Sequence, residues 1–152
     1  MNFLNNIGIQ VKRSWGSQDL PLPKYATTGS AGLDLLAAVD DYYFLAPKER
    51  RLVPTGIYMA IPDGYEGQVR PRSGLAITKG ITILNSPGTI DSDYRGEIGV
   101  IMMNLGDVPI EIKRGMKIAQ LVISKTERVV IAEVSELMTT ARGTGGFGHT
   151  GE

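Results

Sequence analysis

Two short segments carry side chains that could activate water or bind an anion. Asp91-Ser92-Asp93-Tyr94-Arg95-Gly96 begins like a calcium-binding loop, but Arg95 at its fifth position and Met102 at its twelfth do not fit an EF-hand. The segment is therefore either a polar hairpin or the source of one reactive carboxylate, Asp91. In Pro71-Arg72-Ser73-Gly74, an arginine beside the start of a short helix favours an anion, whereas Ser73 as an ordinary N-cap is the simpler interpretation.

The segment 139–152 contains the pattern G-x-G-x-x-G from Gly143 to Gly148. A dinucleotide-binding loop needs a strand before this pattern and a helix after it, and the sequence ends four residues later, so we reject that interpretation. Two alternatives stay open. The segment is a flexible tail, or it is an arm whose Arg142 pairs with phosphate and whose Phe147 stacks on a base.

Two polar side chains stand inside apolar segments. Asp34 lies within AGLDL, and a buried aspartate must be paired or hydrogen-bonded, so a purely structural role is open. Gln120 lies within KIAQLV, where it is either an outward-facing polar residue without a role or part of a site. None of these segments is specific when taken alone.

Composition excludes several classes of protein. The chain has 152 residues, which suggests one domain, and 16 basic residues balance 16 acidic ones. Without net positive charge, general binding to nucleic acid or to anionic membranes is not expected. The absence of cysteine excludes disulfides, Cys-based metal sites and a thiol nucleophile, and a single histidine, His149, disfavours a His-rich metal site or a His-dependent triad. The sequence shows no secretory signal and no membrane-spanning apolar run, so we expect a cytoplasmic protein.

The elements that must position these side chains are mostly strands. Apolar residues alternate with a period of two or form short runs bounded by turn residues, as is typical of an all-β sandwich, jelly roll or barrel. The predicted strands cover 7–11, 57–61, 98–103, 108–112, 118–123 and 129–134. A short helix is predicted at Ser73–Lys79, followed by Gly80. We expect a β-barrel domain over 1–138 and a glycine-rich arm over 139–152.

Taken together and in order, five segments resemble the motifs of the trimeric, all-β dUTPase family. They are AGLDLLAA at 31–38, PRSGLA at 71–76, GTIDSDYRGE at 88–97, KIAQLV at 117–122 and RGTGGFGHTG at 142–151. The second, third and fifth are highly specific in combination. The resemblance implies a jelly-roll-like distorted β-barrel with one short helix and a flexible C-terminal arm.

The resemblance also implies an activity and an assembly. Proteins of this family are homotrimers with three sites between subunits, and they hydrolyse dUTP to dUMP and pyrophosphate with Mg²⁺. This limits uracil in DNA and supplies dUMP for thymidylate synthesis. The match implies that Asp91 activates the attacking water and that Tyr94 lies under the deoxyribose. The uracil edge would be read by Asn85 and by the hairpin backbone, including Thr89, Ile90 and Gly99.

The remaining matched residues imply contacts with phosphate, metal and base. The phosphate oxygens would be held by Arg72, Ser73, Gly74 and Gln120. Asp34 would order water around Mg²⁺ rather than bind the ion directly. From the arm, Arg142 would reach the terminal phosphate and Phe147 would cover the uracil, with further contacts from Gly148 and Thr150.

Two positions depart from the commoner family pattern. Lys117 stands where arginine is frequent, which removes a bidentate donor, and His149 stands where serine is common. Two other functions are considered beside the triphosphatase. One is a dCTP deaminase of the same superfamily, which would need a glutamate poised at cytosine. The other is a catalytically idle protein that binds a nucleotide or a partner on this scaffold.

Overall fold

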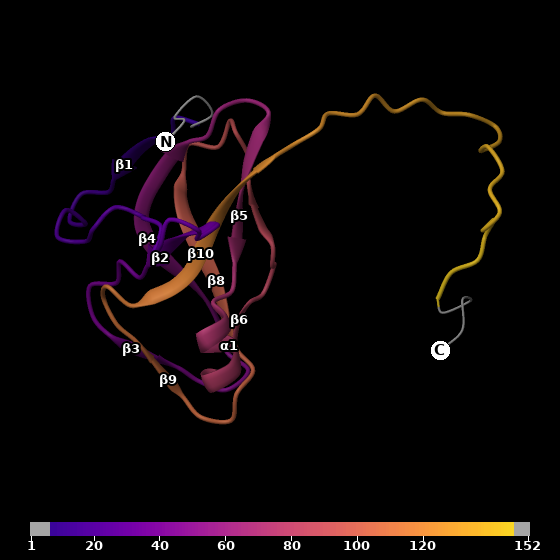
Figure 1. Ribbon diagram of the computed structural model, residues 1–152. Coiled ribbons are helices and arrows are strands. Elements are labelled where there is room, and N and C mark those ends of the chain that lie inside the picture. Colours follow the sequence, from indigo (N-terminus) through magenta and orange to yellow (C-terminus); the bar gives the residue numbers. More distant parts are fainter. Residues whose placement is uncertain (1–6, 148–152) are drawn as a thin grey trace.

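The computed structural model describes residues 7–147 of the chain, which form ten strands and one short helix (Figure 1). The elements are β1 (Gln10–Arg13), β2 (Gly32–Leu36), β3 (Tyr43–Leu45), β4 (Arg50–Ala60), β5 (Tyr65–Arg70), α1 (Ser73–Lys79), β6 (Ile81–Ile83), β7 (Gly88–Ile90), β8 (Glu97–Asn104), β9 (Ile110–Ile112) and β10 (Lys117–Lys125).

The strands build two four-stranded antiparallel sheets and one two-stranded sheet. The orders are β1-β4-β8-β6, β2-β10-β5-β7 and β3-β9, so neighbours in a sheet are mostly distant in sequence. Buried side chains from both larger sheets form a single apolar cluster. The prediction of an all-β, jelly-roll-like fold with one short helix is confirmed.

Alternation with a period of two places the core residues, most clearly in β8. Ile98, Val100, Met102 and Asn104 are buried, while the residues between them are partly exposed. Asn104 is tolerated in the core because its amide donates to the carbonyls of Leu45 and Val108, both at 2.9 Å. These bonds fix the path of the chain where β8 ends.

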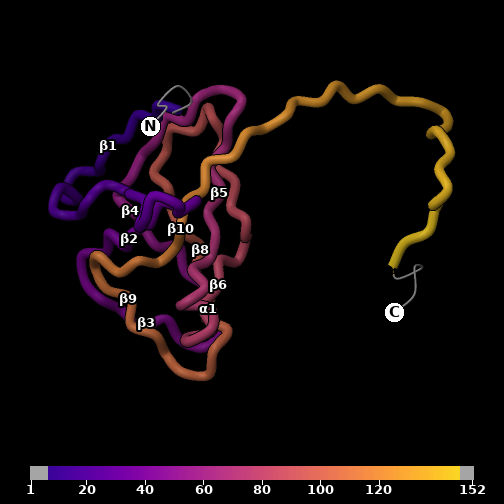
Figure 2. Tube along the Cα trace, viewed as in Figure 1, coloured from indigo at the N-terminus to yellow at the C-terminus, as the bar shows by residue number. Residues whose placement is uncertain are grey.

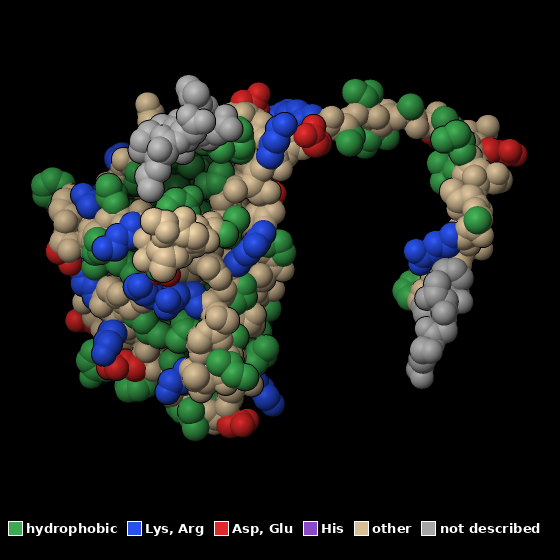
Figure 3. All heavy atoms as spheres, viewed as in Figure 1, with side chains coloured by type: hydrophobic (Ala, Val, Ile, Leu, Met, Phe, Trp, Pro, Cys, Tyr) green, Lys and Arg blue, Asp and Glu red, His purple; other side chains and the backbone are tan. Residues whose placement is uncertain are grey.

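The predicted strand at 129–134 is wrong for this chain. The last strand ends at Lys125, and the chain beyond it runs away from the sheets as an extended segment (Figures 1 and 2). Hydrophobic side chains stand exposed along this segment (Figure 3), and Val130 is 97% exposed. A short apolar run forms a strand when a partner strand is present, and residues 7–147 supply none here. The domain division at 138 stays a prediction.

Helix α1 has the predicted limits, but Ser73 is not its N-cap. Arg72, not Ser73, is the N-cap, and no side chain caps the helix there, so Ser73 is the first helical residue. The helix ends because Gly80 adopts the left-handed conformation with φ of 66°. A Cβ at Gly80 would also lie 2.6 Å from the amide nitrogen of Gly106, so no larger residue fits. No helix within residues 7–147 is long and apolar enough to cross a membrane.

Candidate functional site

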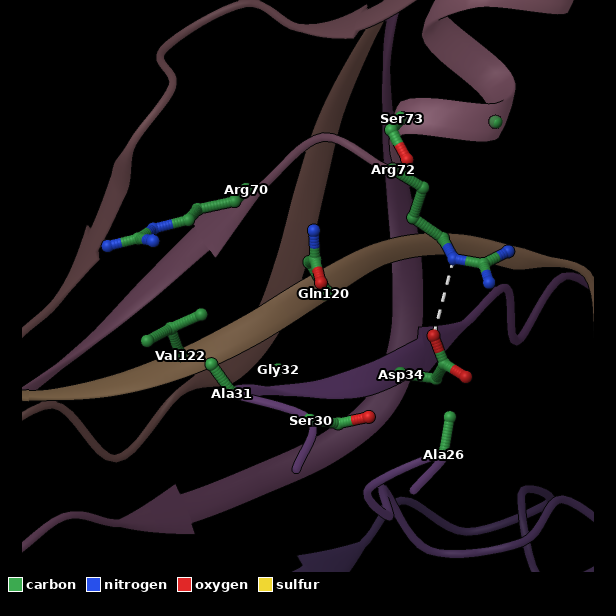
Figure 4. Close-up of a pocket in the computed structure, with 11 residues that line it drawn as sticks. Ala26, Ser30, Ala31, Gly32, Asp34, Arg70, Arg72, Ser73, Gln120 and Val122 are labelled. Atoms are coloured by element: carbon green, nitrogen blue, oxygen red, sulfur yellow. Dashed lines mark ion pairs between the residues drawn. The ribbon is translucent and has the colours of Figure 1, made fainter. Parts of the chain in front are cut away.

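A polar cavity of about 430 Å³ opens where β2, β10, the end of β5 and the start of α1 meet (Figure 4). Four predicted phosphate ligands and the predicted metal-associated carboxylate all line it: Arg72, Ser73, Gly74, Gln120 and Asp34. These residues come from three of the five motifs. The structure therefore brings this part of the predicted site together, and we call the cavity the phosphate pocket.

Gln120 lies at the centre of the phosphate pocket because β10 is flanked by β2 and β5. In the antiparallel registers it stands opposite Asp34 on one side and Arg70 on the other. Its Nε2 donates to the carbonyl of Pro71 at 3.0 Å, which holds the segment that leads into α1. The amide group has a second N–H, so this bond leaves one donor for a ligand. A Cβ at Gly32 would lie 2.5 Å from Oε1 of Gln120, so a larger residue there would push the Gln120 amide aside.

Asp34 is shared by two cations. Its Oδ1 lies 3.2 Å from Nε of Arg72 (Figure 4), and its Oδ2 lies 2.6 Å from Nζ of Lys117. The Asp34 side chain is only 16% exposed, and the ion pairs satisfy the expectation that it needs partners. Arg70 and Arg72 both line the phosphate pocket, and Asp34 is the acidic residue of its lining, so the pocket wall carries a positive excess. Because α1 has only seven residues, these side chains rather than the helix supply most of the charge.

A second cavity, of about 390 Å³, lies beside the hairpin after β7. Five predicted residues line it: Thr89, Ile90, Asp91, Tyr94 and Gly99. Leu52, Glu97 and Ile101 complete its lining. We call this cavity the hairpin pocket. Asp91 and Tyr94 are exposed within it, so both are accessible to a ligand.

Backbone contacts hold the Tyr94 ring in one place. Its Oη donates to the carbonyl of Glu97 at 3.0 Å, and its amide donates to the carbonyl of Asp91 at 3.2 Å. The ring lies against Gly96, where a Cβ would collide with the ring atoms. A phenol fixed in this way can act as a rigid wall for a ligand.

Arg95 is a residue whose role the sequence analysis missed. Its Nη1 donates to the carbonyl of Ser92 at 2.6 Å and to that of Tyr94 at 2.8 Å. The guanidinium therefore braces the loop that carries Asp91. In the sequence, the only signal for this role is an arginine inside a tight polar turn.

The two pockets have no lining residue in common among the residues described. Asn85 lines neither of them and is exposed in the turn between β6 and β7. The next two residues of this turn, Ser86 and Pro87, line a further cavity that also touches Ser73 and Gln120. One chain therefore presents the two parts of the predicted site separately.

The described part of the arm contacts neither pocket. Phe147 is fully exposed, and Nε of Arg142 donates to the carbonyl of Gly145 at 2.8 Å within the arm itself. The arm stands away from the sheets (Figure 2). The structure thus does not bring Arg142 and Phe147 to the other predicted site residues. Gly148, His149 and Thr150 lie outside the described residues.

The carboxylate that lines the phosphate pocket fits one kind of metal site. Residues 7–147 contain no group of three or more His, Cys, Asp or Glu side chains that could hold a metal. Asp34 is the acidic residue among those that line the pocket. This donor set fits Mg²⁺ that is held mainly by phosphate oxygens and water, because Mg²⁺ keeps several waters and often binds through one carboxylate.

Comparison with known proteins gives relatives along almost the whole chain. The dUTPase family model matches residues 18–151. The deoxyuridine 5'-triphosphate nucleotidohydrolase of Methylocella silvestris is 57% identical over 145 residues, which are 94% of this chain and 91% of that protein. The protein of the same name from Wolbachia pipientis wMel is 55% identical over 149 residues, 97% of each chain.

A solved structure has the same fold. The dUTPase of Staphylococcus bacteriophage 80alpha with dUpNHpp superimposes with a TM-score of 0.85 and 26% identity, covering 95% of this chain and 99% of that one. The predicted family is therefore confirmed by both sequence and structure: the chain belongs to the dUTPase family.

Proposed function

We propose that this protein is a dUTP diphosphatase that hydrolyses dUTP to dUMP and pyrophosphate. The observation that carries the proposal is the convergence of Arg72, Ser73 and Gly74 at the start of α1 with Gln120 of β10 in one cavity whose lining carries excess positive charge. A triphosphate is the ligand class that such a wall suits. The names of the bacterial relatives and the dUpNHpp bound to the phage enzyme agree with this substrate.

The complete site forms between subunits of a homotrimer in this proposal. The nucleoside occupies the hairpin pocket of one subunit, and the triphosphate occupies the phosphate pocket of another. Two features support this division: the pockets share no described lining residue, and the described arm extends away from both. The arm of one chain would close over a site that the other chains build.

Asp91 acts as the general base. Its exposed carboxylate takes a proton from water, whose oxygen forms a bond to the α-phosphorus. The bond from that phosphorus to the oxygen bridging to the β-phosphate breaks, and pyrophosphate leaves with the electron pair. Arg72, Gln120 and Ser73 hold the phosphates for in-line attack and offset the charge on the leaving group.

Tyr94 and the hairpin supply selectivity. The Tyr94 ring, tied to the carbonyl of Glu97, lies against the deoxyribose and leaves no room for a 2'-hydroxyl. Asn85 and the backbone of Thr89, Ile90 and Gly99 read the uracil edge, and a narrow hairpin excludes the methyl group of thymine. Contacts of this kind discriminate strongly because a wrong substrate leaves polar groups unpaired.

The arm and the metal complete the site. Arg142 pairs with the terminal phosphate and Phe147 stacks on the uracil, while Gly148 and Thr150 add contacts. Asp34 would hold Mg²⁺ through water. When bound, Mg²⁺ supplies neutralisation of the triphosphate charge. In the cell we place this reaction in the cytoplasm, where it limits uracil in DNA and supplies dUMP for thymidylate synthesis.

The deaminase alternative fits the hairpin pocket less well. The glutamate that lines this pocket, Glu97, is already engaged, because its Oε1 accepts a hydrogen bond from the amide of Gly56 at 2.7 Å. A glutamate fixed to the backbone in this way is not poised for proton transfer to cytosine.

One assay separates the three functions. The purified protein is incubated with Mg²⁺ and, in turn, dUTP, dCTP, UTP and dTTP, and the products are separated by chromatography. We expect dUMP and pyrophosphate from dUTP alone. Formation of dUTP from dCTP would identify a deaminase, and binding of dUpNHpp without any turnover would identify an idle nucleotide-binding protein.

A further inference from the structure

Asp34 stands between two cavities and faces a different cation on each side. One cavity is the phosphate pocket, with Arg72. The other has a volume of about 350 Å³ and is lined by Lys117 and Lys24 as well as by Asp34. Both carboxylate oxygens are thus engaged before any ligand binds, Oδ1 by Arg72 and Oδ2 by Lys117.

The two ion pairs are not equivalent. Arg72 has a second anchor, because its Nη1 lies within 3.5 Å of the carbonyl of Lys117 and donates to it. The Lys117 side chain is 50% exposed, against 34% for Arg72. An ammonium group on a four-carbon stem rotates more freely than a planar guanidinium. Lys117 is therefore the partner that can leave Asp34 without disturbing the pocket wall.

A hydrated divalent cation and Lys117 would compete for the same carboxylate. A carboxylate offers about four acceptor positions. Arg72 and Lys117 together already carry more positive charge than Asp34 carries negative charge. Adding Mg²⁺ beside Asp34 while Lys117 stays in place would bring like charges together. In the absence of metal, by contrast, the ammonium adds positive charge near a triphosphate.

We propose that Lys117 is an internal counter-ion of Asp34 that Mg²⁺ displaces when nucleotide binds, so that this lysine sets how strongly nucleotide affinity depends on the metal. Lys117 is a positioning residue in this proposal, since it acts through Asp34. The inference rests on the proposed function of the phosphate pocket. It gives a role to one of the two positions at which the sequence departs from the commoner family pattern.

The test compares nucleotide affinity with and without metal. The affinity of the 152-residue protein for dUpNHpp is measured by isothermal titration calorimetry, once in saturating Mg²⁺ and once in EDTA. The readout is the Kd in EDTA divided by the Kd in Mg²⁺. We expect Lys117→Met to weaken binding in EDTA and to raise the ratio about threefold, the size of effect that a partly exposed ion pair supports. Lys117→Gln is a second neutral variant and should behave alike.

Two controls make the result specific. Lys24→Met removes a charge from the same cavity, but the ion pairs described for Asp34 do not include Lys24, so its ratio should equal that of the wild type. Lys117→Arg keeps the charge and should stay near the wild-type ratio. This inference alone is overturned if both neutral Lys117 variants keep the wild-type ratio. It is also overturned if Lys24→Met changes the ratio as much as the neutral Lys117 variants do. If the wild type binds dUpNHpp neither in Mg²⁺ nor in EDTA, the proposed function is overturned and the inference falls with it.

Discussion

Gln120 of β10 lies directly opposite Asp34 of β2, and its side chain reaches past the strand edge to bond the carbonyl of Pro71 at 3.0 Å. Three motifs that are far apart in sequence thus meet at one residue of a central strand. The pairing of β2 with β10 sets the distance between the carboxylate and the segment that carries Arg72. Changes to this strand pair should therefore affect ligand binding as well as stability.

Gln120→Ala should weaken both nucleotide binding and the fold. It removes the hydrogen bond to Pro71, which is worth about 1 kcal/mol in unfolding free energy, and one donor of the phosphate pocket. We expect a higher KM for dUTP and a lower urea midpoint, measured by steady-state kinetics and equilibrium denaturation. Gln10→Ala, on the exposed side of β1, is the matched control. Equal effects in the two variants would contradict a role for Gln120.

Asp91→Asn should abolish turnover while leaving binding intact. The amide keeps the size of the carboxylate but cannot take a proton, and loss of a general base costs about 10²–10⁴-fold. The measurements are kcat for dUTP and the Kd for dUpNHpp. Asp93→Asn removes an exposed carboxylate from the same loop that does not line the hairpin pocket, so its kcat should stay near normal. Near-normal turnover in Asp91→Asn would refute the assignment.

Tyr94→Ala should narrow the preference for dUTP over UTP. The ring that excludes a 2'-hydroxyl would be gone, so the ratio of kcat/KM for the two substrates should fall. Tyr94→Phe keeps the ring and loses the bond to the carbonyl of Glu97, so it should retain most of the preference. If Tyr94→Ala still rejects UTP as strongly as the wild type, the ring is not the steric gate.

Deletion of the residues after Ala141 should leave the fold and assembly intact while turnover falls sharply. The bonds described in this part of the arm are internal, such as Gly143 to Thr140 and Arg142 to Gly145, so the sheets do not depend on them. Circular dichroism and native mass spectrometry check the fold and the assembly.

Mixed trimers of Asp91→Asn subunits and arm-deleted subunits test whether the arm crosses between chains. Activity well above either parent supports a shared site, whereas none, in confirmed mixed trimers, would place the arm on its own subunit.

Acid should weaken the fold through one surface ion pair. Arg114 donates from Nε and Nη2 to the two carboxylate oxygens of Asp19, at 2.8 and 2.6 Å, and this hydrogen bonding lowers the pKa of Asp19 below 3.8. Because the pKa of Asp19 is lower in the folded state, its ion pair with Arg114 stabilises the fold fully above the unfolded pKa of 3.8. This stabilisation is lost as the pH falls through the pKa of the folded state.

The urea midpoint tests this at neutral pH and near pH 3. Asp19→Asn should lower the midpoint at neutral pH, and its difference from the wild type should shrink in acid. Asp107→Asn, in the exposed loop after β8, should differ little from the wild type at either pH. A constant difference for Asp19→Asn across this pH range would show that the carboxylate charge is not what matters.

Local signals made part of the fold predictable from sequence. The helix at Ser73–Lys79 was placed correctly because a left-handed glycine, Gly80, ends it. The longer strands β8 and β10 were found because several apolar residues fall within each run. Strands β3, β6 and β7 have three residues each, which are too few to show a period. Strand β9 is equally short but is predicted, because the alternation of Val108, Ile110 and Ile112 begins before the strand.

The motifs name candidate site residues but not their geometry. Five ordered motifs identify the family, and the structure brings the candidate residues of the phosphate pocket together. The sequence does not predict the contact between Lys117 and Asp34, because it depends on the register of two strands that are distant in sequence. The brace from Arg95 to its own loop depends on side-chain direction, which a motif does not encode.

The exposed run at 129–134 has a consequence for how the protein behaves at high concentration. Val129, Val130 and Ile131 are β-prone and stand in water, which is the composition that promotes aggregation. Glu127 and Arg128 precede the run, and Glu133 interrupts it. Such charges discourage stacking of identical segments, because each added copy places like charges side by side. We therefore expect these charges to limit association of the segment with copies of itself.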